Sequence, residues 1–192
     1  GAVDLFALLK ASFRQRPDYL IVGEVRGKEA FVLFQGMASG HASLSTVHAD
    51  STQTLVRRLM TPPISLSPTL VNTLDCVAIA THAVVKGKET RKMRELAEIV
   101  NVDEKGTANT NTPFAWDPRT DKFFSKPGSK VFERIAQKRG FTVQQLQVEF
   151  VKRAKLLWTM YQQNITEFHE VQRIINDYYK DSASVLAKFG VK

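Results

Sequence analysis

The chain has 192 residues, of which 43% are apolar and 24% are charged, a composition typical of a folded globular protein. Its one cysteine, Cys76, excludes an internal disulfide and a zinc site built from several thiolates, and its apolar surroundings predict a core position. No apolar run reaches the length of a membrane-spanning helix, and we expect no targeting segment.

The net charge of +8 is concentrated in the last third of the chain. Residues 1–123 carry 15 Lys and Arg against 13 Asp and Glu, whereas residues 124–192 carry 12 against 6. The basic excess therefore indicates a separate C-terminal unit. Charge alone leaves open whether that unit meets a nucleic acid, a membrane surface or an acidic protein.

Helices and strands are predicted to alternate near the N-terminus. Apolar spacing predicts a helix over 4–15, which Asp4 caps and Pro17 ends, and a strand over 19–22. A helix over 28–38, ended by Gly40, and a strand over 43–47 are expected next. A third helix then begins, capped by Ser51 or Asp50. The first strand, Tyr19–Val22, is apolar throughout, which favours a strand covered on both faces in a parallel sheet. This order is typical of an α/β fold.

The pattern changes after two prolines at positions 62 and 63. We expect a short helix at 67–74, an antiparallel hairpin of strands 76–85 and 91–102, a loop over 106–113 and a further strand at 112–117. From Ser129 onward the spacing is helical. Two apolar stripes are predicted to form a helical core. The first contains Leu146, Phe150, Ala154, Leu157 and Tyr161, and Trp158 is placed on it as well; the second contains Ile165, Phe168, Val171, Ile175 and Tyr178.

A carboxylate, Glu24, ends the first strand. In doubly wound α/β proteins, ligands bind at the carboxyl ends of the parallel strands. A carboxylate there can hold Mg²⁺ through water, or orient and deprotonate a water that attacks a phosphate. The alternative is a structural ion pair with Arg26 or Lys28, and the residues alone leave both interpretations open.

Two histidines flank the second strand. His41 precedes it and His48 follows it, so at about 3.3 Å per residue they lie roughly 17–20 Å apart. That separation argues against one metal ion bound by both. Each histidine is suited to donate a hydrogen bond to a phosphate, and each is equally consistent with a capping or core-edge position.

Two segments carry a resemblance to a known family. RPDYLIVGEVRGKEA and GMASGHASLSTVHADS resemble the Walker B motif and the His box of the secretion ATPase superfamily, which comprises the motors of type II secretion, type IV pilus and archaellum assembly. The resemblance covers residues 1 to about 103. It implies a partial RecA-like P-loop ATPase core with an antiparallel β-hairpin extension over residues 1–123, followed by an α-helical unit over residues 124–192.

The sequence departs from the family pattern in two ways. It contains no Gly-x-x-x-x-Gly-Lys-Ser/Thr loop, which in the family lies upstream of Walker B, so this chain resembles the C-terminal part of a motor and is expected to bind nucleotide weakly by itself. It also lacks the four-cysteine zinc module of many bacterial type II members. This second difference favours an archaeal-type or retraction-like branch, and we expect the archaeal type.

The resemblance also implies roles for individual residues. Glu24 would be the water-activating or Mg²⁺-organising carboxylate and His41 a catalytic residue near the γ-phosphate. Gly23, Arg26 and His48 would be associated with the nucleotide and Mg²⁺, and Arg14 and Arg16 would contact a neighbouring subunit; no direct metal ligand is assigned. For Arg91 and Arg94 we favour a structural role.

The expected function follows from these roles. The intact protein would be a cytoplasmic homo-hexamer at the inner face of the membrane that couples ATP hydrolysis, with Mg²⁺, to assembly or export of pilin-like subunits through a membrane platform protein. One alternative is a nucleic-acid motor, with phosphate contacts at residues 138–140 and 152–155, although no nucleic acid is expected because Trp158 and Tyr161 are placed in the core. Another is a non-catalytic assembly module.

Overall fold

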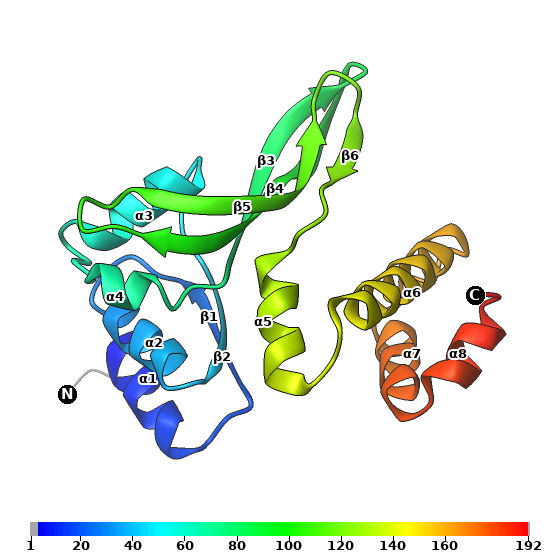
Figure 1. Cartoon of the computed structure of the whole chain (residues 1–192), viewed down its shortest axis with the longest axis horizontal. Helices are drawn as coiled ribbons and strands as arrows, with labels where there is room; N and C mark the ends of the chain where they lie inside the picture. The colour runs from blue at the N-terminus through cyan, green and yellow to red at the C-terminus, as the bar shows by residue number, and fades with distance from the viewer. Residues whose placement is uncertain (1–3, 192) are drawn as a thin grey trace. The chain divides into compact units, whose positions relative to one another are not determined.

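The computed structural model describes residues 4–191, which form two compact units (Figure 1). The first unit extends to Val131 and the second begins at Phe132. The expected domain boundary was at residues 123/124, so the structural division falls slightly later, inside helix α5 (Lys130–Arg139). Each unit is described here by itself.

The first unit begins with an α/β arrangement. In chain order its elements are α1 (Leu5–Arg14), β1 (Tyr19–Glu24), α2 (Glu29–Ala38), β2 (Ala42–Thr46), α3 (Thr52–Met60) and α4 (Pro68–Val71). Asp4 and Ser51 cap α1 and α3 with their side chains, as the sequence predicts. Strands β1 and β2 pair in parallel, from Tyr19 opposite Ala42 to Glu24 opposite Thr46.

Strand β1 is covered on one face only, so the expectation that both faces are covered is wrong. Leu20 and Val22 are buried in one core with residues of α1 and α2, whereas Tyr19 and Ile21 are 66% and 75% exposed. Leu44, opposite Ile21 on β2, is also exposed. Among residues 4–191 the parallel sheet contains just two strands, and no described element packs on its second face.

A four-stranded antiparallel sheet completes the first unit. Its strands, in spatial order, are β3 (Cys76–Val85), β4 (Lys88–Val102), β5 (Ala108–Asp117) and β6 (Lys122–Ser125). Strands β4 and β5 run past α3 and α4 (Figure 1). The hairpin is confirmed, but most of the expected loop over 106–113 belongs to β5, and β6 was not predicted.

The second unit consists of helices. After α5 come α6 (Val143–Gln162), α7 (Phe168–Lys180) and α8 (Ser182–Lys188). Their core contains Leu156, Met160, Ile174, Tyr178, Val185 and Leu186. The first predicted stripe is wrong, because Phe150, Leu157 and Tyr161 are exposed, and so is Trp158 at 60%. The second is confirmed in part: Tyr178 is in the core with Ile165 and Val171 packed against it, whereas Phe168 and Ile175 are exposed. No helix among residues 4–191 combines the length and apolarity needed to cross a membrane.

Candidate functional site

The carboxyl ends of β1 and β2 bring Glu24 next to His48. The register of the two strands shifts between Val22 and Glu24, because Gly23 is an extra residue whose carbonyl accepts a hydrogen bond from the Thr46 hydroxyl. A bulge of this kind turns the side chain that follows it. A methyl group added at Gly23 would meet no atom within 4 Å, so the space beside the strand end is open.

The two oxygens of Glu24 have different surroundings. Oε2 accepts a hydrogen bond of 2.6 Å from the Arg26 guanidinium. Oε1 lies 3.3 Å from Nε2 of His48, is itself buried, and has no hydrogen-bond partner among the described residues. The bond from Arg26 and the charges of Arg26, His48 and Arg58 lower the pKa of Glu24, so the side chain is a carboxylate at neutral pH.

Arg26 also begins the turn that leads into α2. The backbone N–H groups of Arg26 and Gly27 donate to Oε1 of Glu29 at 2.6 and 2.8 Å. Although partial burial alone raises the pKa of Glu29, these bonds outweigh it and lower the pKa. The turn is thus fixed by Glu29, which leaves the Arg26 side chain to bind Glu24.

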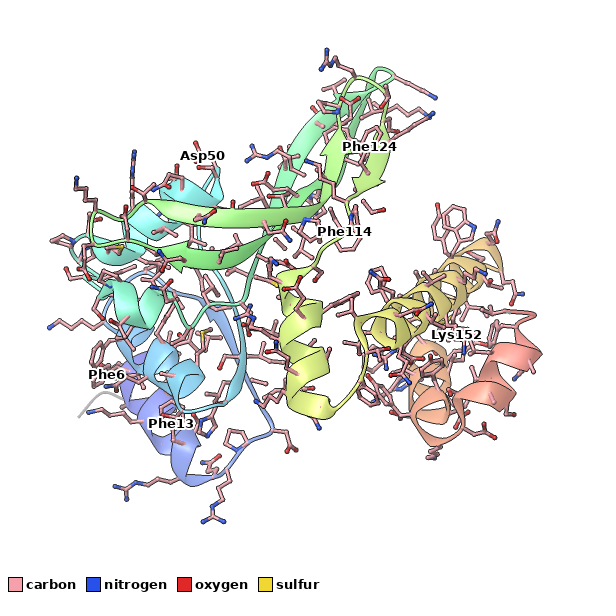
Figure 2. The ribbon with its side chains drawn as sticks, viewed as in Figure 1. Phe6, Phe13, Asp50, Phe114, Phe124 and Lys152 are labelled. Atoms are coloured by element: carbon pink, nitrogen blue, oxygen red, sulfur yellow. The ribbon has the colours of Figure 1, made fainter. Side chains whose placement is uncertain are left out.

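Two arginines that the sequence did not indicate as site residues hold the loop after β2. Arg58, from α3, donates to the His48 carbonyl at 2.7 Å, and Arg94, from β4, donates to the Asp50 carbonyl at 2.7 Å. Asp50 lies at the start of α3 (Figure 2). Bonds from Thr54 and Ser51 lower the pKa of the Asp50 carboxyl. The position of His48 is therefore set by contacts from α3 and the antiparallel sheet.

The other predicted site residues lie at the opposite end of the parallel strands. His41 directly precedes Ala42, which pairs with Tyr19 at the start of β1, so His41 and Glu24 are separated by roughly the length of a strand. The ring of His41 packs on Phe13 of α1, with the ring centres 5.1 Å apart, and its Nδ1 atom is buried without a hydrogen-bond partner among the described residues. Arg14 and Arg16 are exposed at and just after the end of α1.

A cavity of about 560 Å³ adjoins His48 and separates the two sheets. It is lined by β2 and the segment after it, from Ser43 to Ala49, by residues 76–80 of β3, and by apolar side chains of α2 and α3. Strands β2 and β3 are not paired with each other. The cavity therefore lies between two strand edges that have no partner among residues 4–191.

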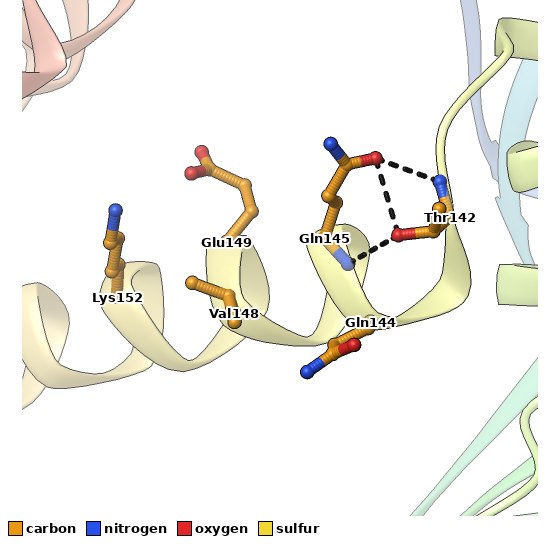
Figure 3. Close-up of a pocket in the computed structure, with 6 residues that line it drawn as sticks. All are labelled: Thr142, Gln144, Gln145, Val148, Glu149 and Lys152. Carbon is orange, nitrogen blue, oxygen red and sulfur yellow. Dashed lines mark hydrogen bonds between the residues drawn. The ribbon is translucent and has the colours of Figure 1, made fainter.

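The described residues contain no cluster of three or more His, Cys, Asp or Glu side chains that could hold a metal ion by themselves. A hollow in the second unit, about 400 Å³ along α6, is lined by Thr142, Gln145 and Lys152 among others (Figure 3). Thr142 and Gln145 bind each other there in a helix cap. None of the residues that line this hollow is among the ATPase site residues predicted from the sequence.

Comparison with known proteins decides the family. The model of the type II/IV secretion system protein family matches residues 1–176. This chain belongs to that family. The membership confirms the secretion ATPase superfamily to which the two sequence segments pointed.

Two relatives come from the archaeon Methanocaldococcus jannaschii, and both are uncharacterized proteins. One is 37% identical over 156 residues, which cover 81% of this chain and 58% of the relative. The other is 34% identical over 183 residues, which cover 93% of this chain and 33% of the relative. A conjugal transfer protein, TrbB of Rhizobium radiobacter, is 30% identical over 102 residues, 53% of this chain and 31% of its own. The chain thus spans between 31% and 58% of the length of these relatives.

Proposed function

We propose that this chain is the C-terminal part of a secretion ATPase in which Glu24 activates or orients the water that attacks ATP. One observation carries the proposal. Glu24 lies at the carboxyl end of parallel strands, Arg26 holds one of its oxygens, and the other oxygen has no hydrogen-bond partner among the described residues. This oxygen is buried beside Nε2 of His48, so water would reach it when the exposed His48 side chain moves, and the ionised carboxylate is then suited to accept a hydrogen bond from that water.

The phosphate-binding loop would come from a segment outside this chain. The sequence holds no such loop, and the chain spans 58% and 33% of its two archaeal relatives. The cavity between β2 and β3 supports an insertion point, because both strands present edges without a partner there. A strand inserted beside β2 would extend the sheet toward a RecA-like core and bring a following loop close to His48 and Glu24.

The residues present fit one end of a nucleotide site. One carboxylate and one imidazole are too few to bind Mg²⁺ directly, but Glu24 can hold a water of the ion's hydration shell. Bound Mg²⁺ and ATP would supply the electrophilic phosphate. Arg26 keeps Glu24 ionised, and His48 is placed to donate a hydrogen bond at the same edge.

The same proposal includes the assembly in which the motor works. Relatives named for conjugal transfer and type IV secretion support a secretion system, and the two archaeal relatives fit an archaeal-type branch. We assign the intact protein to a homo-hexamer at the cytoplasmic face of the membrane, where it would act on a platform protein and on pilin-like subunits. In that ring Arg14 and Arg16 would face a neighbouring subunit. His41 is remote from Glu24 within this chain, so it would act near the γ-phosphate only of a nucleotide bound by a neighbouring segment.

The experiment is ATP hydrolysis by the protein expressed from its complete reading frame. Replacing Glu24 by Gln keeps the shape and removes the base, so we expect the turnover rate to fall by about 10²-fold or more. Glu104→Gln, an exposed loop residue, is the matched control. Unchanged turnover in the Glu24 variant would leave Glu24 as the structural partner of Arg26, and a complete protein without ATPase activity would favour the non-catalytic assembly module.

A nucleic-acid motor remains the second candidate because of one finding in α6. Trp158 and Tyr161 are both exposed, with ring centres 5.5 Å apart, and Lys155 is exposed on the same helix. Exposed aromatic rings near basic groups stack with unpaired bases. Salt-dependent binding of single-stranded DNA that is lost in Trp158→Ala would favour this candidate, whereas the absence of binding would exclude it.

A further inference from the structure

Glu98 on β4 is the one charged side chain that is buried among residues 4–191, with 2% of its surface exposed. Burying a charge is costly unless hydrogen bonds compensate. Glu98 has no part in the chemistry at Glu24. A strand position of this kind usually holds an apolar residue, so the carboxylate requires a reason.

The carboxylate accepts hydrogen bonds from four donors, three of which lie at the start of α5. Oε1 accepts from the Ser129 hydroxyl and from the Val131 N–H. Oε2 accepts from the Lys130 N–H at 2.7 Å and from the side-chain amide of Asn111 at 2.8 Å. Burial alone raises the pKa of Glu98, but these bonds outweigh it and lower the pKa.

These bonds make Glu98 the cap of a helix that begins more than thirty residues away. The first N–H groups of a helix have no partner inside it, and a negative charge near them is favourable. A residue next to the helix usually serves this purpose. Here the carboxylate of Glu98 accepts from two of these N–H groups, and the adjacent Ser129 hydroxyl donates to it as well. The start of α5 is thereby attached to the antiparallel sheet.

The segment before α5 is attached to the same sheet at two further points. The Lys126 N–H donates to the Pro113 carbonyl at 2.8 Å, and Asn111 donates to the Gly128 carbonyl at 2.9 Å. Asn111 lies directly opposite Glu98 in the β4–β5 ladder, so this pair of side chains binds residues 128–131, whereas Lys126 is bound by the backbone of β5. All of these residues belong to the first unit, and α5 continues from there into the second.

We propose that Glu98, with Asn111 beside it, is a latch that holds residues 128–131 on the sheet and so sets where the connection to the second unit begins. With the latch closed, the chain is held on the sheet as far as the start of α5. With the latch open, the four released residues add up to about 13 Å of extended chain. The latch is a conformational device that does not depend on the proposed ATPase activity.

Glu98→Gln tests the latch in the 192-residue chain. Glutamine has the same shape but a single acceptor oxygen, so in either orientation one backbone N–H at the start of α5 loses its acceptor. We expect hydrogen exchange of residues 128–131 to accelerate by about tenfold or more, and trypsin to cleave faster after Lys130. Glu89→Gln, an exposed glutamate on the same strand, is expected to match the wild type.

Two outcomes overturn the proposal. Exchange at 128–131 and cleavage after Lys130 that stay at wild-type rates mean that Glu98 does not hold the segment. Exchange that accelerates equally throughout β3, β4 and β5 means that Glu98 stabilises the core of the sheet instead. If Glu98→Gln fails to fold, Asn111→Ala removes the amide that donates to Glu98 and to the Gly128 carbonyl, and it is expected to accelerate exchange in the same segment to a smaller extent. A wild-type rate in that variant also overturns the proposal.

Discussion

Gly36 lets α2 approach α1 closely at the end of the parallel sheet that holds His41. A methyl group at this position would lie 2.6 and 2.7 Å from two ring atoms of Phe13, closer than carbon atoms pack. Phe13 is labelled on α1 in Figure 2. The ring cannot move away freely because its other contacts include the His41 ring. Gly36 is thus required by packing, although it lies inside a helix.

We predict that Gly36→Ala destabilises the first unit. Alanine improves helix propensity by about 1 kcal/mol, but overpacking costs about 1–3 kcal/mol and is expected to exceed that gain. Thermal unfolding of Gly36→Ala should show a midpoint several degrees lower than that of the wild type. Adding Phe13→Leu to this variant removes the ring that the new methyl group meets, so it should recover part of the lost stability. Gly23→Ala, whose methyl group meets open space, is the control and should melt no earlier than the wild type. A Gly36→Ala midpoint above the wild-type value would contradict the argument.

Local side-chain chemistry made some residue positions predictable. Asp4 and Ser51 were predicted as caps because a cap is recognised from its immediate neighbours. Arg58 and Arg94 were not predicted to support the site, because their bonds to His48 and Asp50 cross 10 and 44 residues of sequence. A single sequence carries no local signal for such contacts.

Among the elements, α6 shows how a cap defines a helix. Thr142 accepts a hydrogen bond from the Gln145 N–H, and the Gln145 side chain accepts one from the Thr142 N–H, which forms a capping box (Figure 3). The helix then runs for twenty residues. Both partners are local, so the start of α6 is determined by the sequence around it.

We predict that Thr142→Ala costs about 0.5–2 kcal/mol of stability in the second unit. The loss should appear as faster hydrogen exchange in the first turn of α6. Gln144→Ala is the matched control, because Gln144 lies between the two partners, is exposed, and takes no part in the box (Figure 3). Equal effects of the two substitutions would mean that the box does not stabilise the helix.

Elements whose stability depends on distant partners were predicted less well. The start of β5, ANTN, has a loop composition, yet it forms a strand because residues Glu98 to Val102 of β4 pair with it. On α6 the apolar residues surround most of the helix, so more than one stripe fits the spacing. Packing with α7 and α8 selects Leu156 and Met160 over Leu157 and Tyr161.

At the scale of the whole molecule, the two units have separate cores of unequal size. The described core of the first unit contains eighteen buried apolar residues, and that of the second contains six. Buried apolar area supplies most of the stability of a domain, so the smaller core is expected to be the weaker one. Units with separate cores unfold in separate steps when few contacts join them.

We therefore predict two thermal transitions, the helical unit melting first. Each unit contains one tryptophan, Trp116 in the first and Trp158 in the second. In a Trp158→Phe background, fluorescence reports the first unit alone, because Trp116 is buried there and donates to Asp121. Far-UV circular dichroism should show both steps and fluorescence the later one. Thr142→Ala should then lower the first step and Gly36→Ala the second, each without moving the other, since the substituted residues lie in different units. If circular dichroism and fluorescence instead change together in a single transition, and both substitutions lower its midpoint, the two units unfold as one.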